Sequence, residues 1–170
     1  IVVVPMVLAK DGKAISTTRI KNSEIDSHGN LNWQLASLSL SNPNKTKILT
    51  SSKIVYESIV QHLEDLPHEE FWVLYLNQSN RLLEKYRLSK GGITQTTVDI
   101  RLAFKRAFEV GATAFILVHN HPSGRLTPSN SDKQITRKFK LAAANVDLKI
   151  LDHLIVSEKG YFSFADESIL

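Results

Sequence analysis

The residues best suited to chemistry lie in one short segment, residues 119–132, which reads His-Asn-His-Pro-Ser-Gly-Arg-Leu-Thr-Pro-Ser-Asn-Ser-Asp. His119 and His121 close an apolar run, 113–118, that predicts a buried strand. Alternate residues of a strand point the same way, so we expect both imidazoles on one face. Asp132 follows at the start of the next predicted helix. Two histidines and one aspartate are the donor set of a catalytic zinc site, where three protein ligands leave a fourth position for water.

A hydrolytic zinc site also needs a base that takes a proton from the metal-bound water and passes it to the leaving group. Glu69 and Glu70 directly precede a second apolar run, 71–76, which predicts another buried strand. Either carboxylate could serve, because adjacent residues point to opposite faces; the pair could also simply cap a strand end. His and Asp donors favour Zn²⁺ but also suit iron or nickel.

Ser129 and Asp132 have a structural interpretation as well. A serine followed three residues later by an acid, before an apolar helical pattern, is typical of a capping box. The two roles are compatible, because an aspartate in the first turn of a helix can still offer an oxygen to a cation. The capping interpretation does not explain the two histidines just upstream.

The other histidines are expected to play lesser roles. His28 and His62 lie in polar or amphipathic surroundings and are predicted at the surface. His68, beside Pro67, has no partner that the sequence suggests. His153 is predicted to point to the opposite face of its strand from Asp152, either as a satisfied core histidine or as a group that orients a ligand or substrate.

Composition indicates a single globular domain, with room for a short extra segment. The 170 residues are 42% hydrophobic and 22% charged, with no cysteine. The lack of cysteine excludes disulfides, Cys-based zinc sites and zinc deaminases that need a Pro-Cys-x-x-Cys pair, and it agrees with a cytoplasmic protein. Residues 1–9 are apolar, but they are too few to span a bilayer and Pro5 interrupts them.

The net charge of +4 is concentrated on two predicted helices. We expect these clusters to form solvated helix faces rather than a nucleic-acid footprint, although a basic stripe beside a metal site could guide an anionic substrate. The clustered residues are Arg101, Lys105 and Arg106 on one helix, and Lys133, Arg137, Lys138 and Lys140 on the other.

Hydrophobic periodicity and turn residues predict alternating helices and strands without a strict βαβ repeat. We therefore predict an α/β fold, a three-layer sandwich in which helices flank a mixed sheet, with a domain boundary near residue 50. The expected strands are 1–9, 71–76, 81–88, 113–118, 147–157 and 161–165. The expected helices are 31–40, 51–66, 97–110 with an apolar face that includes Phe104 and Phe108, and 129–145.

The pattern His-x-His-Pro, six residues, Ser-x-x-Asp resembles the JAMM motif of the MPN+/JAB metallopeptidases. Residues 69–77, 119–124, 127–129 and 151–156 are also similar to the bacterial RadC family, and the likeness covers residues 51–170. The resemblance implies a JAB/MPN-like, cytidine-deaminase-like architecture with His119, His121 and Asp132 as zinc ligands. It further implies Ser129 as a hydrogen-bond donor to the tetrahedral intermediate, and Glu69, two residues before the Phe, as the general base.

Three functions follow as hypotheses. The first is a zinc-dependent hydrolase that cleaves a peptide or isopeptide bond in a protein or peptide substrate. The second is a DNA-associated accessory factor or metal enzyme of DNA repair or mobile elements. The helix-hairpin-helix segment that precedes the JAMM domain in RadC proteins is not recognisable in residues 1–50, which weakens the case for direct DNA binding. The third is a metal-free scaffold, which ranks last because every motif position is present.

Overall fold

A five-stranded mixed sheet organises the part of the chain that the computed structural model describes, residues 47–91 and 98–170. The strands lie in the order β2-β1-β3-β4-β5. β3 and β4 are parallel, and the other neighbouring pairs are antiparallel. The strands are β1 (Glu70–Leu76), β2 (Leu82–Lys90), β3 (Ala114–Asn120), β4 (Lys149–Ser157) and β5 (Gly160–Ser163).

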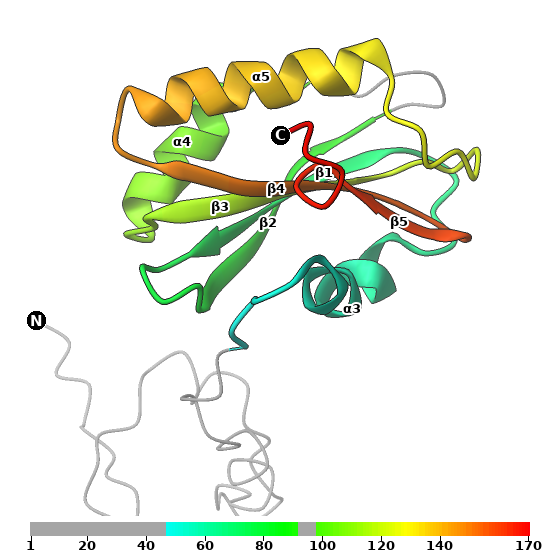
Figure 1. Cartoon of the computed structure of the whole chain (residues 1–170), viewed down its shortest axis with the longest axis horizontal. Helices are drawn as coiled ribbons and strands as arrows, with labels where there is room; N and C mark the ends of the chain where they lie inside the picture. Colours follow the sequence, from blue (N-terminus) through cyan, green and yellow to red (C-terminus); the bar gives the residue numbers. More distant parts are fainter. Residues whose placement is uncertain (1–46, 92–97) are drawn as a thin grey trace, which may run out of the picture. The chain divides into compact units, whose positions relative to one another are not determined.

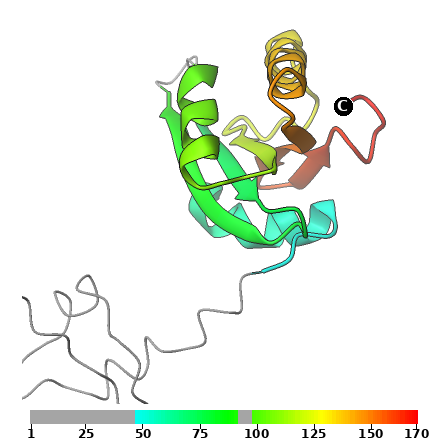
Figure 2. The same cartoon turned by 90° about the vertical axis from the view of Figure 1, so that its left-hand side faces the viewer.

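Three helices of the described residues cover the sheet on its two faces, which confirms the predicted three-layer α/β sandwich (Figures 1 and 2). α4 and α5 lie together on one face, and α3 lies on the other. The helices are α3 (Ser52–Leu63), α4 (Ile100–Glu109) and α5 (Asn130–Ala144).

Each face of the sheet has its own apolar core. On the α4/α5 face, Phe139 and Phe115 are fully buried with Ala103 and Ala107. On the α3 face, Val55, Ile59 and Leu63 recur every four residues and pack against the sheet, as the sequence predicts. Every residue of β3 is buried, because this strand is central in the sheet and covered on both sides.

Local sequence signals define the ends of the helices. Ser51 caps α3 and Asp99 caps α4, each side chain accepting a hydrogen bond from a backbone N–H of the first turn. α4 ends at Glu109, and Gly111, just beyond the capping Val110, has a φ of +66° in the left-handed region that glycine adopts without a steric penalty. Ser129 and Asp132 form the expected capping box of α5, with both reciprocal hydrogen bonds present.

The predicted elements differ from the structure in two informative places. β2 ends at Lys90 rather than at residue 88, because its pairing with β1 continues to Glu70. Phe108 was predicted on the apolar face of its helix but is 59% exposed; of the same predicted face, Ala103 and Ala107 are fully buried. The predicted strand 1–9 and helix 31–40 lie outside the described residues.

No helix within residues 47–91 and 98–170 combines the length and the apolar character needed to cross a bilayer.

Two phenylalanines give a matched test of this packing. Phe139 is fully buried among Phe71, Phe104 and Phe115, with ring centroids 6.0 to 6.2 Å apart. Phe139→Ala should lower the free energy of unfolding by about 3–5 kcal/mol, because it leaves a cavity in the core. Phe108→Ala should change it by less than about 1 kcal/mol. Chemical denaturation of both variants measures the difference, and equal losses would contradict the burial described for α4.

Candidate metal centre

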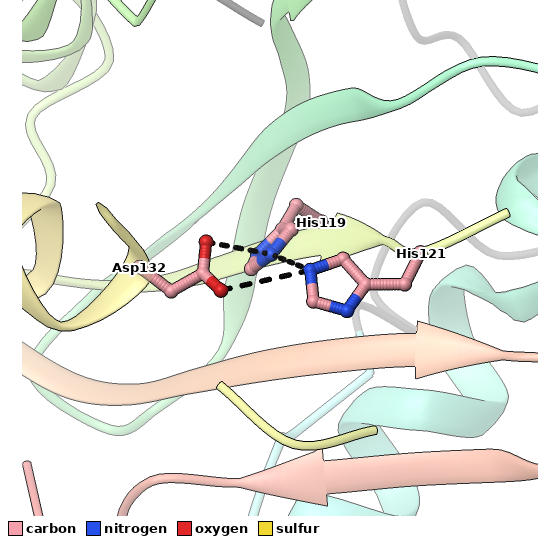
Figure 3. A group of neighbouring side chains, drawn as sticks. All are labelled: His119, His121 and Asp132. Atoms are coloured by element: carbon pink, nitrogen blue, oxygen red, sulfur yellow. Dashed lines mark hydrogen bonds and ion pairs between the residues drawn. The ribbon is translucent and has the colours of Figure 1, made fainter. Parts of the chain in front are cut away.

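Within the described ranges, one group of three His, Asp or Glu side chains is close enough to share a metal ion: His119, His121 and Asp132. Nε2 of His119 lies 3.0 Å from Nε2 of His121. The Asp132 carboxylate places Oδ1 at 3.3 Å from Nε2 of His119 and Oδ2 at 3.6 Å from Nε2 of His121. Figure 3 shows the carboxylate facing both rings. The structure thus brings together the three residues that the sequence singled out.

Two neighbouring elements hold these side chains in place. His119 is the penultimate residue of β3, and His121 follows the strand directly. Asp132 sits in the first turn of α5, where its Oδ2 accepts a hydrogen bond of 2.7 Å from the Ser129 N–H. The capping box therefore fixes the carboxylate against the end of the strand, so the structural role and a ligand role coexist.

The hydrogen bonds of the two rings show which nitrogens remain for a cation. Nδ1 of His121 lies 2.6 Å from the carbonyl oxygen of Arg125, which can only accept, so this nitrogen carries the proton. Nδ1 of His119 is bonded to Nε2 of His153 at 2.8 Å. In a neutral His121 the bare nitrogen is therefore Nε2, the atom directed toward Asp132 and His119.

The spacing of the three donor atoms fits a small divalent ion. Zinc bonds of 2.0–2.1 Å in tetrahedral geometry separate neighbouring ligand atoms by about 3.3–3.4 Å. The observed separations of 3.0, 3.3 and 3.6 Å bracket that value. The donor set and its spacing therefore suit a metal ion of this kind.

Electrostatics at the site also favour a positive charge. Burial raises the pKa of Asp132, but the adjacent imidazoles of His119 and His121 outweigh it and hold the pKa far below its usual range. Burial lowers the pKa of His121, yet hydrogen bonds to Asp132 and to the Arg125 carbonyl leave that pKa above its ordinary value. The Asp132 carboxylate is thus ionised, and its negative charge stabilises a positive charge beside it, as the raised pKa of His121 shows.

The structure distinguishes between the two glutamates at the start of β1, Glu69 and Glu70. Glu70 is buried and its carboxylate is occupied by three donors: His68 and Arg87, each at 3.2 Å, and the indole N–H of Trp72 at 3.0 Å. Burial raises the pKa of Glu70, but these hydrogen bonds and the Arg87 charge together lower the pKa below its ordinary value. Glu70 therefore anchors the start of β1. His68, for which the sequence suggested no partner, is one of the hydrogen-bond donors to its carboxylate.

Glu69 is held in a different way, through its backbone. The side chain of Asn120, between the two histidines, accepts a hydrogen bond of 2.7 Å from the Glu70 N–H and donates one of 3.0 Å to the His68 carbonyl. The Glu69 carbonyl in turn accepts from the Gly91 N–H at 2.8 Å. These three bonds fix the segment around Glu69, and the negative charge of Glu69 contributes to the raised pKa of His121.

An open cavity of about 960 Å³ exposes the candidate metal centre. Ser129 lies on its wall, where its hydroxyl oxygen already accepts from the Asp132 N–H at 3.1 Å. The Ser129 O–H proton can still be donated. The cavity is lined by Glu69, Glu70, Phe71, Val98, His119, His121, Ser123, Arg125, Thr127, Pro128, Ser129, Ser131, Asp132 and Ile135.

Two buried residues behind the centre extend its hydrogen-bond network. His153 bonds to His119, and its Nδ1 lies 2.6 Å from the hydroxyl of Thr136. The sequence offered His153 as a core histidine or as one that orients a ligand or substrate, and the structure shows it fully buried and hydrogen-bonded to His119. Thr136 was missed, although its position one helical turn after Asp132 places it on the same face of α5.

The basic residues of α4 are paired with acids. Arg101 contacts Asp99 at 2.7 Å, and Arg106 contacts Glu84 at 2.7 Å and Glu109 at 2.9 Å. These ion pairs favour the interpretation of α4 as a solvated face.

Comparison with known proteins gives the family. The sequence profile of the RadC-like JAB domain matches residues 49–169, which is most of the chain. The chain belongs to the RadC family. A UPF0758 protein of Flavobacterium johnsoniae is 57% identical to it over 125 residues, covering 74% of this chain and 55% of the relative.

Other RadC-family relatives match the same region. A UPF0758 protein of Porphyromonas gingivalis is 46% identical over 72% of this chain and 54% of the relative. UPF0758 protein YeeS of Escherichia coli is 42% identical over 71% of this chain and 82% of the relative. The chain thus spans about half the length of the Flavobacterium and Porphyromonas relatives, and its five-stranded α/β sandwich is a JAB-type fold.

The anchoring role of Glu70 predicts a pH-dependent loss of stability. Glu70→Gln should lower the free energy of unfolding by about 1–3 kcal/mol at pH 7, because His68, Trp72 and Arg87 lose a charged acceptor. Since the folded pKa lies below the ordinary 4.5, this stabilisation is complete above pH 4.5 and is lost as the pH falls through the folded value. Urea denaturation between pH 3 and 7 measures it, with Glu57→Gln on the exposed side of α3 as the control. A loss that is independent of pH would contradict this assignment.

Proposed function

We propose that this domain is a zinc-dependent hydrolase of the JAMM type that cleaves a peptide or isopeptide bond. The observation that carries the proposal is the convergence of His119, His121 and Asp132 in an open cavity that Glu69 and Ser129 also line. Membership of a family with a RadC-like JAB domain supports it.

In this proposal the cation is bound by Nε2 of His119, Nε2 of His121 and a carboxylate oxygen of Asp132. A zinc ion at such a site supplies a water ligand with a pKa near 7 and polarises a substrate carbonyl. The protein contributes fixed donors: the Arg125 carbonyl orients the His121 ring, and the Ser129 backbone orients the carboxylate. Three protein ligands leave coordination positions open toward the cavity.

Glu69 is the proposed general base. Its carboxylate would accept a proton from the attacking water and deliver it to the amine nitrogen that leaves, so the carbonyl–nitrogen bond breaks with no charge left on the amine. Glu70 is a poorer candidate, because its carboxylate already accepts from three donors. The base assignment therefore follows from the occupied oxygens of Glu70 and from the match of Glu69, two residues before Phe71, to the place of the general base in the JAMM pattern.

Ser129 is the proposed donor to the oxygen of the scissile carbonyl. The hydrogen bond from the Asp132 N–H holds the hydroxyl oxygen of Ser129 in place. Only the direction of its O–H bond remains variable. Such a preset donor stabilises negative charge that develops on the substrate oxygen.

Two substitutions separate chemistry from metal binding. Glu69→Gln should reduce turnover by at least about 100-fold while zinc remains bound, because only the proton carrier is lost. Asp132→Ala should lose zinc at a chelator concentration that leaves the parent protein loaded. Glu57→Gln is the matched control for the first substitution and should behave as the parent protein.

Metal content is measured by elemental analysis after gel filtration. Turnover is measured by mass spectrometry, as new amino termini in a proteome-derived peptide library and as freed lysine side-chain amines in a library of peptides joined through lysine side chains. Full hydrolytic activity of Glu69→Gln would refute the base assignment, and zinc retention by Asp132→Ala would refute the ligand assignment.

A further inference from the structure

A buried chain of hydrogen bonds leads from His119 back to the residue that carries the third candidate ligand. Nδ1 of His119 lies 2.8 Å from Nε2 of His153, and Nδ1 of His153 lies 2.6 Å from Oγ1 of Thr136. The same Thr136 hydroxyl lies 2.5 Å from the backbone carbonyl oxygen of Asp132. The chain joins β3, β4 and α5, the three elements around the site.

The direction of the protons in this chain follows from one acceptor. The Asp132 carbonyl cannot donate, so the Thr136 hydroxyl donates to it and its oxygen must accept from His153. His153 therefore carries its proton on Nδ1. In a neutral imidazole the other nitrogen, Nε2, is then the acceptor, so His119 donates from Nδ1 and keeps a bare Nε2.

The surroundings of His153 favour its neutral form. The side chain is fully buried, and the ring of Phe164 stacks on it with a centroid distance of 4.7 Å. Phe71 lies against both His153 and His119, at 5.6 and 5.7 Å. The hydrogen-bond partners of the His153 ring are an imidazole and a hydroxyl, neither of which is a carboxylate. A buried imidazolium without a paired carboxylate is costly.

We infer that Thr136 and His153 are positioning residues that set the tautomer of His119, so that Nε2 is free to bind the metal ion. The inference rests on the proposed metal site. The first acceptor of the hydrogen-bond chain is the backbone carbonyl of Asp132. The helix that supplies the carboxylate ligand therefore also determines which nitrogen of His119 carries the proton. Ligand histidines commonly donate their second N–H to a carboxylate or carbonyl. Here a neutral histidine takes that place and its orientation depends on one threonine hydroxyl.

Removing the hydroxyl while keeping the shape tests the inference. In Thr136→Val the Nδ1 proton of His153 loses its acceptor, so the proton moves to Nε2 and His119 is forced to protonate its own Nε2. The dissociation constant for zinc should rise about 10- to 100-fold. Thr136→Ser keeps the hydroxyl and should bind zinc within about twofold of the parent protein.

A second threonine provides the matched control. The hydroxyl of Thr113 is buried without a hydrogen-bond partner, so Thr113→Val removes the same group outside the chain. This variant should leave the zinc dissociation constant unchanged. His153→Gln, whose amide oxygen can still accept from His119, should bind zinc at least about tenfold more tightly than His153→Leu.

The readouts are zinc affinity, by competition with a chromophoric chelator, and the imidazole tautomers, by ¹⁵N NMR of the metal-free protein. We expect His119 and His153 with protons on Nδ1, and His119 with its proton on Nε2 in Thr136→Val. Protonation of His119 on Nε2 in the parent protein, or unchanged zinc affinity in Thr136→Val, would overturn the inference. Absence of zinc binding by the parent protein would instead count against the proposed function, while the NMR tautomers still decide the order of protons.

Discussion

The Nε2 atoms of His119 and His121 lie 3.0 Å apart, and when both are unprotonated their lone pairs repel unless a positive charge lies beside them. The rest of the site is arranged around this constraint. The Nδ1 atoms are turned toward fixed partners, His153 and the Arg125 carbonyl, and the ionised Asp132 completes the triangle. Each imidazole is held by its far nitrogen, so the near nitrogens cannot turn away to relieve the repulsion. A bound cation relieves it by accepting both lone pairs.

The fold brings this arrangement about through a single crossover. β3 and β4 are parallel neighbours, and α5 connects them, so the N-terminus of α5 lies beside the C-terminal end of β3 (Figure 1). The strand end supplies the imidazoles and the first helical turn supplies the carboxylate. The antiparallel neighbour β1 begins at the same edge, because Phe71 pairs with His119. Glu69 therefore lines the cavity from a third segment, and Asn120 fixes that segment through the backbone of its two neighbours, His68 and Glu70.

Sequence alone predicted much of this, for reasons that are local. The spacing of His119 and His121 on a strand, and of Ser129 and Asp132 at a helix start, depends on backbone periodicity and was confirmed as geometry. The choice between Glu69 and Glu70 could not be made from periodicity, because it depends on His68, Trp72 and Arg87 meeting Glu70. The prediction that Phe108 is buried was wrong, because helical periodicity shows which residues share a face but not how much of that face the neighbouring elements cover.

The central claim is that one divalent cation binds Nε2 of both histidines and the carboxylate of Asp132. X-ray absorption spectroscopy at the zinc edge, on protein loaded with one equivalent of zinc, tests it most directly. The account predicts four-coordinate zinc with two imidazole nitrogens at about 2.0–2.1 Å and oxygen at the remaining positions. Zinc surrounded only by oxygen, or with a single imidazole, would contradict it.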